Sequence, residues 1–428
     1  MRKIPFRRLL LLWLAWVFIV ISFQALATAR LKPQWPDNAQ EWTAREAKSA
    51  DYQKGRPYLM EPFLSDQVAW DSEYYLAIAT GGYDNPQVGH ISDSGGTPAS
   101  PNPPPAEPRS YSLSYAFLPL YPWTMWLVSW PLKLLGLNPI ATAALAGIIV
   151  SALGTFGGML ALYDLTQESL GEEGALRAAF YLLIFPTGFF LVQVYTEGLF
   201  VGLAFGCLAM LKRRHWWFAA LLGAAAALTR AVGVALVIPM AITWIRTGEW
   251  YDLDMEWRQI FLQGAPWRSL GKALLAFAPL VAFLIWKFSY LGLAFDYVES
   301  HFFGRGLLEM GRSFFAWTEA FIALSSGIPE RTAYFLTEFI GLALGIVTCI
   351  ACLKHDPEVA WFSLAVFVLS WGSGGVQGIQ RYLLGAPAVF IMLARWGKNP
   401  VFDRAWTTFS LLLMGLLAML FAFNFWVA

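Results

Sequence analysis

The chain has 428 residues, of which 57% are hydrophobic and only 14% are charged. Since soluble globular proteins carry charge on about a quarter of their residues, this composition predicts a protein whose outer surface lies largely in lipid. Thirty basic and 29 acidic residues give a net charge of +1, which argues against a nucleic-acid-binding protein. The three cysteines lie in apolar runs, so neither a disulfide-rich secreted fold nor a zinc cluster is expected.

Apolar runs long enough for membrane helices recur along the chain. A spanning helix needs about 20 mainly apolar residues, and a bundle of such helices pairs its backbone polar groups internally. We therefore predict an all-α polytopic transmembrane bundle with about 10 to 12 membrane helices. The candidate runs are 9–28, 115–136, 139–163, 175–193, 194–211, 216–246 (one long helix or two short ones), 272–293, 333–353, 359–378, 381–396 and 405–427.

The first run follows a basic N-terminus and ends in an Ala-rich stretch, a pattern also typical of a cleavable signal peptide. Its apolar core is long for such a peptide, so we favour a membrane anchor whose basic flank stays in the cytoplasm. Segment 29–114 then lies outside as a large first extracytoplasmic loop carrying short amphipathic helices. Its Pro-rich part, 95–108, predicts an extended loop or a disordered insertion. The basic stretches 246–272 and 395–404 are expected inside.

Counting crossings exposes a conflict in the first half of the chain. Residues 212–214, Lys-Arg-Arg, are expected in the cytoplasm, yet a full crossing by every apolar run between 115 and 211 places them outside. One run is therefore expected not to cross. Gly, Pro and polar residues inside 184–198 make that region our candidate for a broken or shallow pair of helices, which membranes tolerate only where protein buries the backbone or water fills a cavity.

The outer segment contains one clear helical pattern with acids at its start. Residues 68–83 carry apolar or aromatic side chains at helical spacing and end in Gly81-Gly82, which predicts a short amphipathic helix on the outer face. Asp71 stands at the start of this helix and Glu73 in its first turn. A carboxylate there caps free backbone N–H groups and faces the positive end of the helix dipole, so capping is one interpretation of both acids.

Ionisable residues inside predicted spans form a second group. Such residues are costly in a membrane and are functional candidates for that reason. Arg230 and Arg381 offer a forked guanidinium that suits phosphate oxygens. The alternatives are an internal ion pair between Arg230 and Glu197, and a snorkelling Arg381 at a helix end.

These segments together resemble, in order, the motifs of the PIG-V family, which comprises GPI mannosyltransferase 2 and its prokaryotic relatives. The resemblance covers about residues 66–390. The matching pieces are Asp71-Ser-Glu73, Tyr115-Ala-Phe-Leu-Pro119-Leu-Tyr121-Pro122, Phe185-Pro186-Thr-Gly-Phe-Phe, Tyr195-Thr-Glu197, Leu228-Thr229-Arg230-Ala-Val-Gly233 and Gln380-Arg381-Tyr382-Leu-Leu.

The resemblance implies an integral membrane glycosyltransferase of the GT-C class that takes mannose from a polyprenyl (dolichyl) phosphate. It implies Asp71 as the catalytic base, accompanied by Glu73. The sequence departs from the family's pattern in its longer outer loop and around His301, which leaves the acceptor open. No cofactor is implied, because a divalent cation at the two acids is not required by a monophosphate donor.

The remaining candidate residues follow from the chemistry of transfer, which needs a base on one side of the sugar carbon and cations on the other. We assign the donor phosphate to Arg230, Gln380, Arg381 and Tyr382. We assign acceptor binding or support of the site to Tyr195, Glu197 and His301. The alternatives are belt aromatics for the two tyrosines and a solvated side chain for the histidine.

We therefore predict two modules, a catalytic one at 1–246 and a C-terminal one at 247–428. The expected partners are a polyprenyl-phosphate sugar donor, a glycolipid or glycan acceptor and membrane lipids, but no nucleic acid. The expected location is the plasma membrane of a prokaryote or the endoplasmic reticulum of a eukaryote, with an extracytoplasmic active site and inversion at the sugar. A multi-pass secondary transporter or lipid flippase-like protein is the alternative, because broken helices with intramembrane charges also mark transport pathways.

Overall fold

The computed structural model describes residues 5–47, 49–92, 110–247 and 267–428. The Pro-rich stretch 95–108 and most of the basic loop 246–272 lie outside the described residues. Within them the fold is almost entirely helical, and the one sheet is a hairpin of β1 (His90–Ser92) and β2 (Ser110–Ser112) with Ile91 opposite Tyr111. The predicted all-α class is confirmed.

Four of the described helices are long and apolar enough to cross a membrane, and a fifth span arises if a bent helix pair is counted as one. The four are α1 (Phe6–Arg30), α6 (Pro139–Leu183), α15 (Pro329–Cys352) and α19 (Pro400–Ala422). The pair is α11 (Trp267–Ala276) and α12 (Ala278–Lys287), bent by 49°. The chain is thus a multi-pass integral membrane protein, and the count of about 10 to 12 membrane helices stays a prediction.

Several apolar runs form helices too short to span a bilayer alone, because about 20 residues are needed. They are α7 (Glu197–Lys212), α8 (Trp216–Thr229), α9 (Val237–Thr247), α16 (Pro357–Trp371) and α18 (Pro387–Trp396). The run 216–246 is therefore two helices, separated by the 3₁₀ turn Ala231–Leu236. The other helices are α2 (Glu41–Glu46), α3 (Pro57–Met60), α4 (Ser72–Gly81), α5 (Leu120–Leu132), α13 (Tyr290–His301), α14 (Met310–Ala323) and α17 (Ile379–Tyr382).

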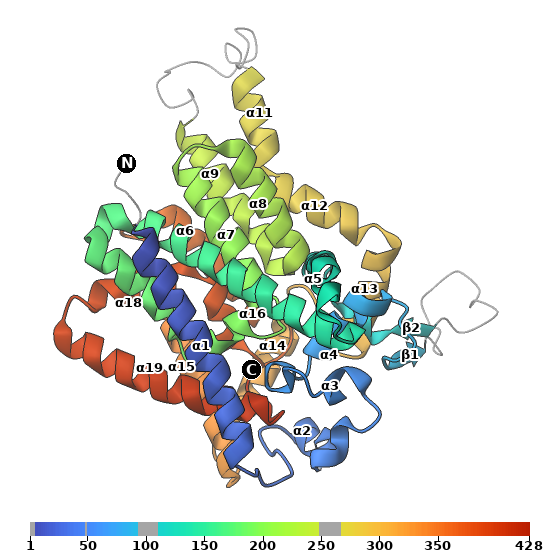
Figure 1. Ribbon diagram of the computed structural model, residues 1–428. Helices are drawn as coiled ribbons and strands as arrows, with labels where there is room; N and C mark the ends of the chain where they lie inside the picture. The colour runs from blue at the N-terminus through green and yellow to red at the C-terminus, as the bar shows by residue number, and fades with distance from the viewer. Residues whose placement is uncertain (1–4, 48, 93–109, 248–266) are drawn as a thin grey trace.

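Helix α6 is the central element of the bundle, in contact with α1, α5, α7 and α18 (Figure 1). It begins with Pro139 after Asn138, whose side chain accepts a hydrogen bond from the Ala141 N–H, a favourable start for a helix. The run 139–163 and the first part of the run 175–193, up to Leu183, are joined in this helix, which is broken at Gly171 with a φ of +73°. Glycine adopts that conformation at little cost, so the chain turns back there without a loop.

Basic residues gather at the end of the bundle where α1 begins. Arg8 of α1 bonds Glu172 at 2.9 Å, and Lys212 of α7 lies 3.1 Å from Glu168. Figure 1 shows the N-terminus at the upper left, whereas α2, α3 and the hairpin lie at the lower right. Residues 212–214 therefore share an end with the N-terminal basic flank, as the positive-inside rule requires of cytoplasmic segments.

The run 115–136 does not extend to the end of the bundle where α1 begins. Just before α5, Tyr115 donates a hydrogen bond to Asp84, and just after it Asn138 donates one to Glu61, both at 2.7 Å. Both partners belong to segment 29–114, so α5 starts and finishes beside the outer segment. Its 13 residues rise about 20 Å, less than the roughly 30 Å hydrocarbon core. A return of α5 to the outer side would remove the conflict in the crossing count, and this topology stays a prediction.

A cysteine introduced at Lys133, after α5, tests this return. Lys133→Cys is expected to react with an impermeant thiol reagent from the same side as Lys54→Cys of the outer segment, because both ends of α5 lie there. Lys398→Cys, between α18 and α19, is the control for the opposite side. The three native cysteines are buried, which keeps the background low. Labelling of Lys133→Cys together with Lys398→Cys would show that α5 crosses the membrane.

The backbone between α6 and α7 is broken, as the sequence predicted. Residues 184–196 form turns and the 3₁₀ segment Gly188–Val192, and every one of them is buried. The Val194 N–H donates to the Gln67 carbonyl at 3.1 Å, so the break meets the outer segment. Irregular backbone at this depth is tolerated because protein covers it.

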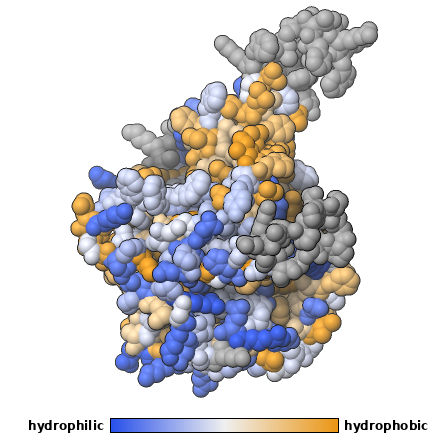
Figure 2. Space-filling view, turned by 90° about the vertical axis from the view of Figure 1, so that its right-hand side faces the viewer, coloured by the Kyte–Doolittle hydropathy of each residue, from blue (hydrophilic) through white to orange (hydrophobic). Residues whose placement is uncertain are grey.

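The hydrophobic surface of the molecule agrees with a membrane environment. Figure 2 shows hydrophobic residues gathered over the upper part of one face, where α11 and α12 lie in Figure 1, while the lower part is mainly hydrophilic. Exposed apolar side chains there include Leu274, Ile285 and Phe288, each at least two-thirds exposed. Exposed patches of this size are favourable only against lipid or protein.

Candidate functional site

Helix α4 brings Asp71 into the interior, and the capping interpretation of this acid is wrong. Asp71 occupies the cap position of α4, but its side chain makes no cap hydrogen bond. Its backbone N–H donates to the Tyr195 hydroxyl at 3.2 Å, and that hydroxyl donates to the Ala69 carbonyl at 3.1 Å. The broken segment before α7 thus fixes the start of α4 and leaves the Asp71 carboxylate free for another partner.

Helix α4 differs in one respect from the sequence-based expectation. It ends at Gly82 with a φ of +79°, as predicted from the Gly pair. Most of its side chains are buried, however, so it is not an amphipathic helix lying on the surface. The reason is that α3, α5 and α6 contact it from several directions. Asp71 is therefore held by a packed framework and not by a loose surface element.

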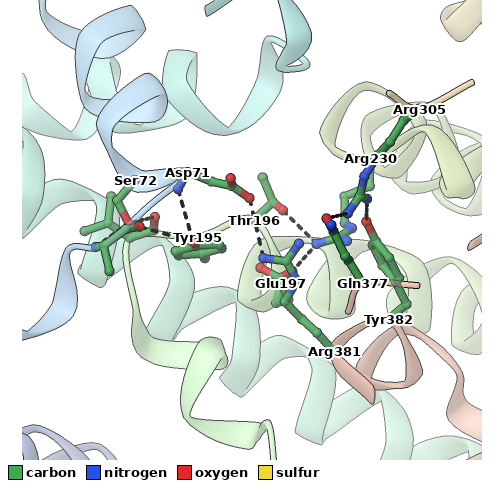
Figure 3. A network of polar contacts seen from close by, with 12 residues as sticks. Asp71, Ser72, Tyr195, Thr196, Glu197, Arg230, Arg305, Gln377, Arg381 and Tyr382 are labelled. Atoms are coloured by element: carbon green, nitrogen blue, oxygen red, sulfur yellow. Dashed lines mark hydrogen bonds and ion pairs between the residues drawn. The ribbon is translucent and has the colours of Figure 1, made fainter. Parts of the chain in front are cut away.

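The partner of Asp71 is Arg381, which carries the first of two linked ion pairs (Figure 3). Arg381 Nη1 lies 3.5 Å from Asp71 Oδ2, and Arg381 Nε lies 3.4 Å from Glu197 Oε1. The same Glu197 oxygen bonds Arg230, which also donates to the Thr196 hydroxyl at 3.0 Å. Glu197 therefore bridges two arginines, and the predicted pair between Arg230 and Glu197 exists.

Burial decides between two interpretations of Arg381. Its side chain is only 6% exposed, so the snorkelling interpretation, which requires the guanidinium to reach headgroups, is wrong. Removing a guanidinium from water costs several kcal/mol unless charges and hydrogen bonds compensate it. The contacts to Asp71 and Glu197 supply that compensation. They join the outer segment, the start of α7 and α17 at one point.

Tyr382 is the aromatic centre around which three arginines assemble. The guanidinium carbons of Arg230, Arg305 and Arg381 lie 4.8, 6.0 and 5.6 Å from the centroid of its ring. Its hydroxyl accepts a hydrogen bond from Arg305, which also donates to Gln377 at 3.4 Å. Cations within about 6 Å of a ring face are attracted by the ring quadrupole. The interpretation of Tyr382 as a belt aromatic is therefore wrong, since its ring is turned to this cluster.

Some predicted site residues lie apart from this network. Glu73 is buried on another side of α4, with its Oε2 3.6 Å from Arg56. Burial raises the pKa of the Glu73 carboxyl, and the charge of Arg56 opposes the rise. Gln380 donates to the Val427 carbonyl at 3.0 Å and does not face the arginines. His301 is exposed and stacks on Tyr297 at 4.2 Å, in agreement with the solvated interpretation.

The sequence analysis missed three residues at or near the site, namely Arg305, Glu299 and Glu338. Arg305 reaches Tyr382 from the turn after α13. In the sequence, the only feature that pointed to it was its place in an outer stretch that also contains Glu299. Burial raises the pKa of Glu299 to about 7, opposed by Arg305 and reinforced by Asp71. Glu338 of α15 lies fully buried behind α17. An acid inside a predicted span was the available signal for it.

A small pocket opens at the arginine cluster. Polar walls come from Glu197, Arg230, Arg381 and Tyr382, and the remaining walls are apolar, namely Phe200, Val201, Val232, Leu384 and Gly385. Glu197 Oε2 is buried and has no hydrogen-bond partner among the described residues. Within the same part of the chain, no group of three or more His, Cys, Asp or Glu side chains is placed to hold a metal. The pocket therefore combines cations with an apolar side.

No family model matches the chain, and no curated protein matches it. Among solved structures, it is similar to ArnT from Cupriavidus metallidurans bound to undecaprenyl phosphate, with a TM-score of 0.41 and 15% identity over 72% of this chain and 61% of ArnT. It is also similar to the oligosaccharyltransferase AglB from Archaeoglobus fulgidus in complex with an inhibitory peptide and a dolichol-phosphate, with a TM-score of 0.39 and 15% identity over 96% of this chain and 55% of AglB. The chain thus spans less than two thirds of either protein. At this level of similarity neither structure assigns a family or an activity.

Proposed function

We propose that the chain is a membrane glycosyltransferase of the GT-C class that moves a sugar from a polyprenyl phosphate to a glycolipid or glycan acceptor outside the cytoplasm. The observation that carries the proposal is the meeting of Asp71, from the outer segment, with the arginines 230, 305 and 381 around Tyr382. These residues come from four distant parts of the chain. A cap or a surface ion pair does not require such an arrangement.

The charges of the site suit a lipid phosphate. Three guanidinium groups gather here, whereas the carboxylates bonded to them among the described residues are those of Asp71 and Glu197. Guanidinium forks bind phosphate oxygens with directed, charge-assisted hydrogen bonds. The apolar walls of the pocket, such as Phe200 and Leu384, are buried beside these arginines. Arg230 and Arg381 are the proposed phosphate ligands, with Arg305 beside them.

The proposed reaction is a single displacement at the anomeric carbon. As the acceptor oxygen attacks, its proton passes to the Asp71 carboxylate. The bond from the anomeric carbon to the phosphate oxygen breaks, and its electron pair leaves with the polyprenyl phosphate. The arginines stabilise the charge that develops on the leaving phosphate. A single displacement of this kind inverts the configuration at the anomeric carbon.

The resemblance to the PIG-V family supports mannose as the sugar. It also supports Asp71 as the base. Glu73 faces Arg56 rather than the arginine cluster, so we assign it to acceptor binding and not to proton transfer. Tyr195 holds the start of α4, and the free oxygen of Glu197 is placed to accept a hydrogen bond from a sugar hydroxyl. The module boundary near residue 246 stays a prediction.

Sugar transfer by the purified protein tests this function. Proteoliposomes are supplied with radiolabelled polyprenyl-phosphate mannose and a lipid extract of the source membrane, and chromatography follows free polyprenyl phosphate and labelled product. We expect both to appear together, with slower turnover of the glucose analogue. Movement of the labelled lipid between leaflets without chemical change would favour the alternative of a flippase-like transporter and contradict the proposal.

A further inference from the structure

The turn that carries Arg381 and Tyr382 is anchored by a carboxylate from another helix. Glu338 of α15 is completely buried. Its Oε1 accepts the N–H of Gly378 at 2.7 Å, and its Oε2 accepts the N–H of Ile379 at 2.9 Å. Both N–H groups stand at the start of α17, where a helix offers backbone donors without an internal acceptor. Glu338 therefore holds the first residues of the short helix that ends in Tyr382.

The carboxylate is itself oriented by a chain of hydrogen bonds. The Tyr334 hydroxyl donates to Glu338 Oε1 at 2.9 Å and accepts from the Trp426 indole N–H at 3.2 Å. Together with the two backbone N–H groups, these contacts satisfy a buried carboxyl group that has no ion-pair partner among the described residues. Leaving such a carboxylate without hydrogen bonds is strongly unfavourable. The geometry of the turn and the orientation of the Glu338 carboxyl group thus support each other.

The backbone at this turn is also constrained by two glycines. Gly378 has a φ of +78° and gives the chain a sharp change of direction just before α17. Gly341, one turn after Glu338 on α15, lets the two helices approach closely, since a Cβ there would lie 3.2 Å from the Gln380 Cβ. The contact between α15 and α17 is therefore close, and a small shift of α15 or of the carboxylate moves Arg381.

We propose that Glu338 is a positioning residue that sets the place of the Arg381 guanidinium, and with it the affinity for the phosphate of the lipid donor. The inference rests on the proposed function, because Arg381 has that role only if the protein binds a lipid phosphate. Glu338 does not touch the pocket and acts through the backbone of residues 378–381. A misplacement of about 1 Å by a group remote from the reaction costs up to about a hundredfold in rate.

The test compares Glu338→Gln with the wild-type protein in two assays. An amide offers only one acceptor oxygen and turns its NH₂ toward a backbone donor, so one of the two anchoring bonds is lost. We expect the apparent KM for the polyprenyl-phosphate donor to rise at least about tenfold, while the KM for the acceptor stays unchanged. We also expect farnesyl phosphate, a C15 isoprenyl monophosphate, to raise the wild-type Tm and to raise that of Glu338→Gln much less. Glu338→Asp keeps two oxygens and should recover part of both effects.

Asp164→Asn is the matched control, because Asp164 is also a buried carboxylate, bonded to Arg213 at 2.8 Å at the opposite end of the bundle. It should lower the Tm without changing the donor KM. If Glu338→Gln does not fold, Gly341→Ala serves as the test variant. Its methyl group presses on the same turn from α15 and should raise the donor KM in the same way.

The outcomes separate the inference from the proposed function. Normal donor KM and a normal response to farnesyl phosphate in folded Glu338→Gln, or in Gly341→Ala where only that variant folds, would overturn the positioning role alone. If the wild-type protein neither turns over a polyprenyl-phosphate sugar nor responds to farnesyl phosphate, the proposed function itself fails. Equal rises of the donor and acceptor KM would point to general loosening of the site and would also overturn the inference.

Discussion

Asp71→Asn is expected to abolish sugar transfer while the protein still folds. The Asp71 side chain makes no cap hydrogen bond, and the contact to Tyr195 uses the backbone N–H, so the start of α4 does not depend on the carboxylate. An amide has almost the same shape but does not accept a proton from the acceptor hydroxyl. Turnover of the purified variant in the donor assay should fall at least about a hundredfold.

Variants of two other acids on the outer segment are the comparisons for Asp71→Asn. Asp84→Asn is the control, because the Asp84 side chain is exposed and, among the described residues, bonds only the Tyr115 hydroxyl. It should keep normal turnover. Glu73→Gln should raise the acceptor KM and reduce turnover far less than Asp71→Asn, since Glu73 faces Arg56. Near-normal turnover of Asp71→Asn would exclude it as the base.

Arg381→Lys is expected to weaken the use of the lipid donor even though the charge is kept. The guanidinium contacts Asp71 through Nη1 and Glu197 through Nε. A single ammonium group does not reproduce that fork, and its geometry toward phosphate oxygens is lost as well. Turnover measured over a series of donor concentrations should show kcat/KM reduced by about tenfold or more, which corresponds to about 1.4 kcal/mol of transition-state stabilisation.

Arg230→Lys, measured beside it, separates the roles of the two arginines. Arg230 bonds Glu197 and Thr196 and lies over the Tyr382 ring, whereas the ion pair to Asp71 is made by Arg381. A loss in both variants supports joint binding of the phosphate. Arg213→Lys is the matched control, because Arg213 forms a two-bond pair with Asp164 far from the site and should affect only stability. Unchanged kinetics in both Arg381→Lys and Arg230→Lys would reject the arginine mechanism.

Much of the fold follows from local sequence features. Apolar length predicted the membrane helices α1, α15 and α19, because hydrocarbon admits few other structures. Proline stands in the first turn of α6, α15, α16, α18 and α19, where its missing N–H has no cost. The end of α4 at its Gly pair and the broken backbone at 184–196 were also predicted from the sequence. Each of these signals acts within a few residues of the position that it determines.

The tertiary structure alone decided what those residues do. Asp71 was equally suited by sequence to cap its own helix, yet its carboxylate bonds Arg381, 310 positions away. The contact of Asn138 with Glu61 joins the end of α5 to the outer segment, and Arg305 and Glu338 became site residues only because packing brings them to α17. Helix length and helix ends are fixed by neighbours along the chain. The partner of a buried charge is fixed by whichever distant side chain packing brings within reach, because in a medium with little water only a nearby opposite charge or hydrogen-bond donor compensates its burial.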